Sequence, residues 1–194
     1  MTYTMVYDNS PPTMTSWYSY NNLSSTRTAV GSARTGTGSP INDTITKVEV
    51  ALNNGTSDNT AVFTIKVFDS THTERTTDFS TVSSSAIGGH AWHEFTSSTG
   101  ITINSGDVIT CYATTNPASD VQIGYGDNTE SEVAVHELTS SWSTGTADIY
   151  MRLYTTDGGS GGGGSGGGGE EDPAPTGDGF PKDRLQILQM VVPR

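Results

Sequence analysis

The chain of 194 residues has a formal net charge of −12, is 32% hydrophobic and only 15% charged, and contains 23 glycines. With so few Lys and Arg residues it cannot neutralise nucleic-acid phosphates or bind an anionic membrane surface, so we expect neither partner. No apolar stretch is long enough to predict a membrane-spanning helix. Because Thr, Ser, Asn and Gly carry most of the polarity, the composition favours an all-β fold with many turns.

The N-terminal segment offers the first candidate binding residues. Met1–Asp8 has neither the basic nor the apolar part of a secretion signal, so we expect synthesis in a cytoplasm. Trp17, Tyr18 and Tyr20 then follow a polar stretch. Exposed aromatic rings can stack on sugar rings or on a partner protein, so these three are candidates for ligand stacking. The alternative is that Trp17 and Tyr18 pack this segment onto the rest of the body.

Period-two alternation predicts two strands in the middle of the chain, Thr44–Leu52 and Ala61–Asp69. The turn-forming loop Asn53–Asn59 lies between them, so we expect the two strands to form a hairpin. The apolar side chains predicted to face the core are Val48, Val50, Leu52, Phe63, Ile65 and Val67.

Further short strands fill the rest of the body, and their spacing predicts an antiparallel β-sandwich or barrel. Trp92 begins one of them and is expected in the core, and the single cysteine, Cys111, is expected to be a buried, inert thiol. The last strand should bury Ile149, Met151 and Leu153. The predicted ranges are Trp92–Thr96, Ile101–Ile103, Val108–Thr114, Val121–Tyr125, Val133–Leu138 and Ala147–Tyr154.

The order of these segments carries a resemblance. It extends from Ile45–Leu52 through the Asn104–Asp107 turn to the closing strand Ala147–Tyr154. This pattern resembles the jelly-roll sandwiches of carbohydrate-binding modules and of many extracellular and phage structural proteins. The resemblance implies an antiparallel β-sandwich of jelly-roll type, and it supports the fold far more than any activity.

Candidate chemical residues are few. His90 and His93 flank Trp92, but on a strand they point to opposite faces and make a poor metal chelate. The acidic loop with Asp127, Asn128 and Glu130 has three interpretations: oxygen ligands for Ca²⁺, a glycosidase pair, or a solvated turn. Ca²⁺ is the only cofactor that we consider. No serine lies in a nucleophile elbow, so we expect no enzymatic activity.

A flexible tether divides the chain. Residues 158–169 contain only glycine and two serines, which predicts a flexible linker, either a natural hinge or an engineered insertion. The predicted parts are therefore a β-sandwich domain (1–157), the linker (158–169) and a C-terminal arm (170–194).

The C-terminal arm begins acidic and proline-rich and ends in an apolar block, Leu185–Val192. We expect this block to dock on a sheet edge or groove of a neighbouring copy or of another protein, and the alternative is packing onto its own body. The candidate docking residues are Leu185, Ile187, Leu188, Met190, Val191 and Val192.

These features together predict a non-catalytic structural or attachment protein of the virion-decoration, fibre or surface-coat type. It would act as an oligomer on a virion or extracellular surface. One alternative is a carbohydrate-binding module that stacks glycans on Trp17, Tyr18, Tyr20 or Trp142. The other is an engineered scaffold that displays a fused peptide.

Overall fold

The computed structural model describes residues 1–9, 16–22, 25–35, 38–55, 58–127, 135–139, 141–145 and 147–156. The chain divides into two units, Met1–Ser160 and Gly161–Arg194. All described residues belong to the first unit, so the predicted linker and C-terminal arm lie outside the described residues. Within the described part, no helix is long and apolar enough to cross a membrane.

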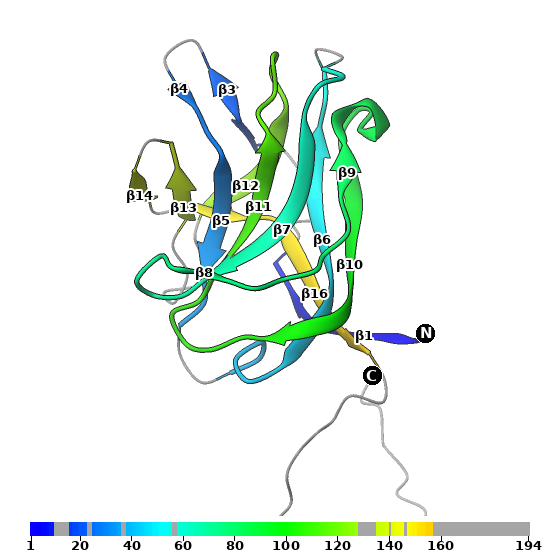
Figure 1. Ribbon diagram of the computed structural model, residues 1–194, viewed down its shortest axis with the longest axis vertical. Coiled ribbons are helices and arrows are strands. Elements are labelled where there is room, and N and C mark those ends of the chain that lie inside the picture. The colour runs from blue at the N-terminus through cyan, green and yellow to red at the C-terminus, as the bar shows by residue number, and fades with distance from the viewer. Residues whose placement is uncertain are drawn as a thin grey trace, which may run out of the picture. The chain divides into compact units, whose positions relative to one another are not determined.

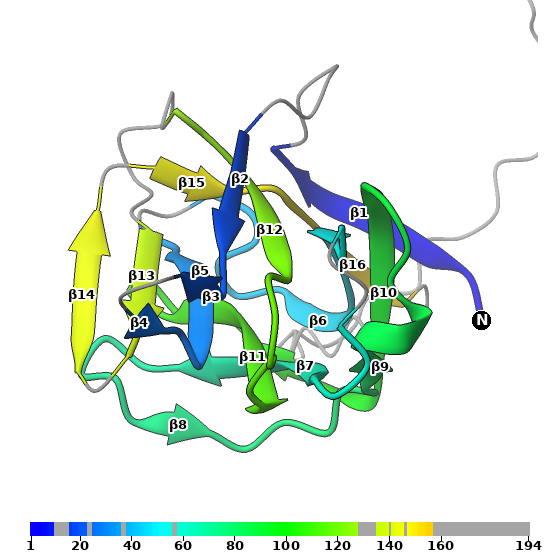
Figure 2. The ribbon, with the colours of Figure 1, turned by 90° about the horizontal axis from the view of Figure 1, so that it is seen from above.

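Two seven-stranded antiparallel sheets form the body (Figures 1 and 2). Sheet I contains β1 (Tyr3–Asp8), β2 (Ser16–Ser19), β6 (Thr44–Asn53), β10 (Ala91–Thr102), β12 (Gln122–Asp127), β15 (Ala147–Ile149) and β16 (Met151–Thr156). Sheet II contains β5 (Ala29–Ala33), β7 (Val62–Phe68), β8 (Glu74–Arg75), β9 (Val82–Ser83), β11 (Val108–Thr115), β13 (Val135–Leu138) and β14 (Trp142–Gly145). The short strands β3 (Asn21–Asn22) and β4 (Ser25–Thr26) pair with each other, and η1 (Ser84–Ala86) is a 3-10 turn.

The strand order is that of a jelly roll. In sheet I the strands β1, β16, β6 and β10 lie side by side, and in sheet II the strands β5, β11, β7 and β8 do so. Numbered along the chain, these eight strands give the orders 1-8-3-6 and 2-7-4-5, so the chain crosses repeatedly from one sheet to the other. The predicted antiparallel β-sandwich of jelly-roll type is confirmed.

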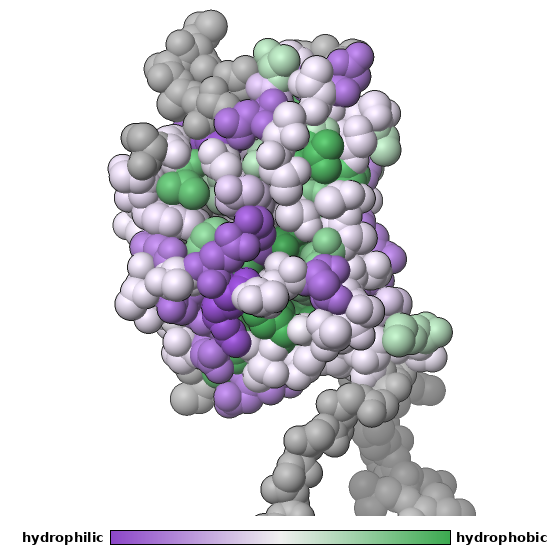
Figure 3. Space-filling view, in the orientation of Figure 1, coloured by the Kyte–Doolittle hydropathy of each residue, from purple (hydrophilic) through white to green (hydrophobic). Residues whose placement is uncertain are grey.

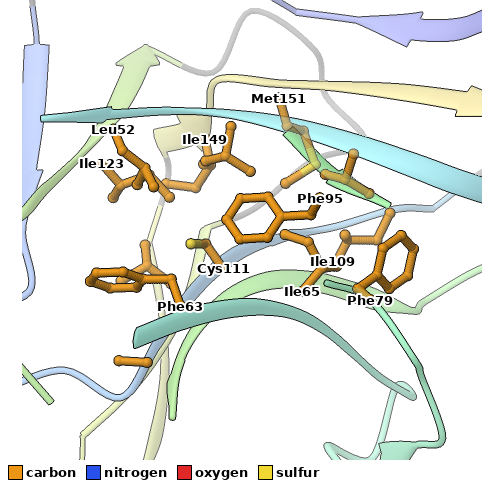
Figure 4. Packing of buried hydrophobic residues seen from close by; sticks show 14 of the residues in the cluster. Leu52, Phe63, Ile65, Phe79, Phe95, Ile109, Cys111, Ile123, Ile149 and Met151 are labelled. Atoms are coloured by element: carbon orange, nitrogen blue, oxygen red, sulfur yellow. The ribbon is translucent and has the colours of Figure 1, made fainter. Parts of the chain in front are cut away.

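The core lies between the two sheets (Figure 4). Phe95 occupies its centre, with Leu52, Ile149 and Met151 on the side of sheet I and Cys111 on the side of sheet II. The residues that alternation predicted to be buried are all at most 1% exposed: Val48, Val50, Leu52, Phe63, Ile65, Val67, Ile149, Met151 and Leu153. Period two therefore located the inner faces correctly.

The predicted hairpin is wrong, because β6 and β7 belong to opposite sheets. Their apolar faces are buried against each other across the core, which two hydrogen-bonded neighbours could not achieve. The turn residues instead build a crossing between the sheets: the Asn54 amide donates to the carbonyls of Asp58 (2.6 Å) and Ser84 (2.8 Å). The Asp58 carboxylate accepts from the backbone N–H groups of Ala61 (2.9 Å) and Ala118 (2.8 Å).

The predicted closing strand is divided at Tyr150. The Tyr150 N–H donates to the carbonyl of Gly124 (2.9 Å), and its own carbonyl accepts from the Ala51 N–H (3.4 Å). Here the chain changes partner, from β12 to β6, while the alternation of its side chains continues unbroken. Alternation missed β5 because all five of its residues are buried.

Candidate functional site

The outer face of sheet I is the surface on which polar and aromatic side chains meet. On β6, Lys47, Glu49 and Ala51 alternate with the core residues and point away from the core. Their partners on the neighbouring strands are Trp92, Glu94 and Thr96 of β10 and Arg152 and Tyr154 of β16. Successive outward positions along a strand are about 6.7 Å apart. The face is therefore a regular ladder whose side chains are fixed by cross-strand pairing.

Five rings of this face are named the aromatic strip: Tyr3, Trp17, Trp92, Tyr150 and Tyr154. Two glycines of β12, Gly124 and Gly126, form the surface on which the Tyr150 ring lies. A Cβ on Gly126 would lie 2.5 Å from the Tyr150 hydroxyl, and one on Gly124 would lie 3.0 Å from the Tyr150 ring and 3.6 Å from the Trp17 ring. Because both positions lack side chains, Tyr150 can lie against the sheet.

Ion pairs occupy the space among these rings. The Lys47 ammonium lies 3.0 Å from the Glu49 carboxylate and 3.1 Å from that of Glu94, and the Arg152 guanidinium lies 3.4 Å from Glu49. The Tyr154 hydroxyl donates to Glu49 at 2.8 Å. The charges of the ladder are therefore satisfied by one another.

The two cations also lie against aromatic rings. The Lys47 ammonium is 3.9 Å from the centre of the Tyr154 ring and 4.9 Å from that of Tyr3, while the Arg152 guanidinium carbon is 4.1 Å from the centre of the Trp92 ring. Cations in these positions are attracted to the ring quadrupole. Each of these three rings is thus held in place on a half-buried residue.

These contacts shift the pKa values of Glu49, Lys47 and Tyr154. Burial works against ionisation of Glu49, but hydrogen bonds from Tyr154 and Lys47 outweigh it and lower the pKa of the carboxyl group. Burial likewise opposes the charge on Lys47, yet its bonds to Glu49 and Glu94 raise the pKa of the ammonium. Burial and the bond to Glu49 raise the pKa of Tyr154. Lys47 and Glu49 therefore both stay charged at neutral pH.

The residues proposed for stacking fall into different environments. Trp17 is half-buried on the outer face of sheet I and stacks on His90, with ring centres 4.0 Å apart and an interplanar angle of 21°. The backbone of Tyr18 lies in β2, and its side chain is outside the described residues.

Tyr20 is fully buried, which corrects its assignment as a stacking residue. Its ring packs edge-on against Phe63, with ring centres 5.0 Å apart, and its hydroxyl donates to the carbonyl of Cys111 at 2.6 Å. Tyr20 therefore closes the core and presents no ring face to a ligand. Burial also raises the pKa of the Cys111 thiol to about 12, as expected for an inert cysteine.

Trp142 lies on the other sheet. It stacks on His72, with ring centres 4.5 Å apart and an interplanar angle of 11°, and meets Phe68 edge-on at 4.9 Å. Phe68 forms a small second core with Ala33 and Val108, against which Trp142 packs. The Trp142 ring is thus engaged in packing within the body.

The prediction that Trp92 lies in the core is wrong. On β10 the inward position is held by the fully buried Phe95, so the neighbouring even-numbered positions point outward. Alternation alone could not decide this, because Trp92 and Phe95 are both aromatic and lie an odd number of residues apart. The direction follows only from which of the two faces the opposite sheet.

The candidate calcium ligands stay a prediction. Asp127 ends β12, and its side chain, together with Asn128 and Glu130, lies outside the described residues. Among the residues that the structure describes, no group of three or more His, Cys, Asp or Glu side chains could hold a metal ion. His90 is exposed before β10 while His93 is half-buried within it, where burial lowers its pKa.

Sequence reasoning missed the carboxylates that organise the loops. Burial opposes ionisation of Asp58, but hydrogen bonds from the Ala61 N–H and the Ser84 hydroxyl prevail and hold its pKa well below the usual range. The hydroxyls of Ser97 and Ser98 lower the pKa of Asp78 to about 2. Asp58 follows the turn-forming run Asn53–Ser57, whereas Asp78 follows two threonines and carries no such sequence signal. Their contacts assign them to the scaffold.

The residues proposed for docking, Leu185, Ile187, Leu188, Met190, Val191 and Val192, lie outside the described residues. Neither a family model, nor a curated protein, nor a solved structure matches this chain.

Proposed function

We propose that the protein is a non-catalytic attachment protein of the virion-decoration, fibre or surface-coat type. In this proposal the β-sandwich is the rigid body, and the apolar block Leu185–Val192 docks on a neighbouring copy. The acids Asp58 and Asp78, which could otherwise be considered for catalysis, accept backbone and hydroxyl hydrogen bonds of the scaffold. They support an architectural role for the sandwich.

The observation that carries the proposal is the position of the apolar block in the sequence: Leu185–Val192 follows a Gly/Ser run that separates it from the β-sandwich. The described members of the main hydrophobic cluster lie between Tyr20 and Leu153. A compact apolar block is costly to leave in water and is suited to a partner surface.

The sequence between the body and this block suits docking on another molecule. The Gly/Ser run 158–169 has a typical reach of roughly 20 Å and an extended limit of about 40 Å. A tether of this length keeps the block at high local concentration near neighbouring copies. Weak docking then becomes firm once many copies are arrayed.

The test is the solution mass, measured by light scattering behind a sizing column. Three proteins are compared: the full chain, a chain that ends at Asp157, and a full-length variant with Leu185→Ser, Leu188→Ser and Val192→Ser. The last retains the linker and removes only the apolar character of the block. We expect the full chain to assemble and both altered proteins to be monomers.

Equal assembly of all three proteins would show that the body alone makes the contacts. A monomeric full chain would overturn docking on a second copy and leave a different protein as the partner. Capture of that protein by the unaltered tail and not by the serine variant would then identify it.

A further inference from the structure

The outer face of sheet I carries a second set of aromatic side chains that a ligand can contact. The rings of Tyr3, Trp92 and Tyr154 come from three different strands, β1, β10 and β16, and each residue is half-buried. At the far end of the same face, Trp17 lies within van der Waals distance of the position that a Cβ on Gly124 would take. The aromatic strip therefore extends across the sheet.

The ring positions are set before any ligand arrives. Trp92 and Tyr154 each lie against a cation, and those cations, Arg152 and Lys47, are in turn paired with Glu49. A ring held on a sheet by such contacts loses little conformational entropy on binding. This preorganisation favours a ligand that needs flat apolar surfaces at fixed positions.

The charges of the face restrict the class of ligand. Lys47 is paired with Glu49 and Glu94, and Arg152 is 3.5 Å from Asp8 as well as 3.4 Å from Glu49. Three carboxylates thus pair with two cations on this face, and the whole chain has a formal net charge of −12. A polyanion would be repelled by this field. An uncharged ligand with hydroxyl groups can use the remaining donor and acceptor capacity of the paired side chains.

The composition of the exposed surface favours a glycan over a protein as its ligand. The outward positions of β6, β10 and β16 hold charged, aromatic and threonine side chains, with Ala51 fully buried as the one aliphatic member of the ladder. The central part of a protein interface is apolar and depleted of charge. Sugar rings instead alternate apolar C–H faces with hydroxyl edges, and this matches rings set among paired charges.

We propose that the aromatic strip on the outer face of sheet I binds a neutral polysaccharide, with Trp92 and Tyr154 as its central stacking residues and with Tyr150, which is buried, as support beneath it. This inference does not depend on the docking of the C-terminal block. It also assigns binding to residues other than Tyr20, which is buried, and Trp142, which packs on sheet II.

The experiment is affinity electrophoresis of the full chain in native gels that contain soluble neutral polysaccharides: β-glucan, xylan, galactomannan and hydroxyethyl cellulose in separate gels. We expect retardation in at least one gel. In that gel, Trp92→Ala and Tyr154→Ala should each weaken binding by at least about tenfold, whereas Trp92→Phe should retain part of it. Circular dichroism of each variant separates loss of binding from loss of fold.

The matched control is Tyr112→Ala, which removes a ring from the outer face of sheet II that also lies under a lysine, Lys66, at 4.1 Å. Its binding should equal that of the parent. Because the charges of the strip are paired, raising the salt to 0.5 M should change the affinity by less than about twofold.

Three results would each overturn the inference: retardation in none of the neutral gels, equal retardation of folded Trp92→Ala and Tyr154→Ala variants, or binding of alginate in preference to every neutral chain. A chain that ends at Asp157 should bind like the full chain. Failure of this inference is thereby distinguished from failure of tail docking.

Discussion

The outer faces of the two sheets use similar side chains in different ways. Each places a lysine against a tyrosine ring: Lys47 on Tyr154 at 3.9 Å in sheet I, and Lys66 on Tyr112 at 4.1 Å in sheet II. The rings of both faces are half-buried, but their neighbours differ. On sheet I the rings lie among ion pairs. On sheet II, Trp142 packs edge-on against Phe68 and completes a small core.

Sheet curvature explains the difference. Trp142 belongs to β14 and Phe68 to β7, and the strands β13, β5 and β11 lie between them in the sheet. Contact across so many strands requires sheet II to curl over its own outer face, as the view from above shows (Figure 2). On the side where β7 and β8 lie in front, hydrophobic residues form only small separate areas (Figure 3). The glycan site is therefore proposed on sheet I, whose rings lie among ion pairs, and not on sheet II, whose Trp142 ring packs against Phe68.

The largest expected difference between the two sheets comes from a pair of glycine substitutions. A Cβ on Gly31 of β5 would overlap the backbone carbonyl of Ile109, whereas one on Gly126 of β12 would meet the side chain of Tyr150. Backbone cannot move aside, so Gly31→Ala should cost more than about 3 kcal/mol and Gly126→Ala about 1 kcal/mol in urea unfolding. Equal costs would contradict the close approach of Gly31 to the backbone of Ile109.

The crossing between β6 and β7 joins the two sheets and is held by the hydrogen bonds of Asp58. Asp58→Asn replaces a carboxylate that accepts from Ala61, Ala118 and Ser119 by an amide that can accept at only one atom. We expect a loss of about 2–3 kcal/mol of unfolding free energy. Asp69→Asn is the control, since this exposed carboxylate also caps a turn, and its loss should be clearly smaller. Similar losses would show that the crossing contributes no more to the unfolding free energy than the turn at Asp69.

The same substitution, tryptophan to alanine, can be compared on the two outer faces, at Trp142 on sheet II and at Trp92 on sheet I. Trp142→Ala removes contacts with Phe68 and His72 and should destabilise the protein by about 2 kcal/mol, because it opens the small core of sheet II. Trp92→Ala removes a ring whose main contact is the Arg152 guanidinium and opens no core, so it should cost about 1 kcal/mol or less. Thermal unfolding measures both. The reverse order would mean that sheet I, and not sheet II, uses its outer rings for packing.

The sequence predicted the inner faces because burial on one side imposes period two, as for Val48, Val50 and Leu52. It failed where another constraint decided the outcome. The Asn53–Asn59 loop forms a crossing between the sheets and not a hairpin. Its composition predicts a turn but not whether the next strand pairs in the same sheet or in the opposite one. Trp92 and Tyr20 exchanged their expected places, because aromatic residues satisfy either a core or an exposed sheet face. The ion pairs of Lys47 and Glu49 require the strand order, which only the fold supplies.

The smallest expected effect is the difference in stability that a single carboxylate contributes on each of the two outer faces. The folded state lowers the pKa of Glu49, so its contribution to stability is complete above its ordinary value of about 4.5 and is lost as the pH falls through the folded value. Glu49→Gln should therefore cost about 1 kcal/mol at pH 7, and its unfolding free energy should converge with that of the parent at low pH. Glu74→Gln on sheet II removes a carboxylate whose side chain is 47% exposed, and at pH 7 it should cost less than about 0.5 kcal/mol. Urea titrations from pH 3 to pH 7 test both. Curves for the parent and Glu49→Gln that stay parallel throughout would show that Glu49 stabilises sheet I by packing and not by its charge.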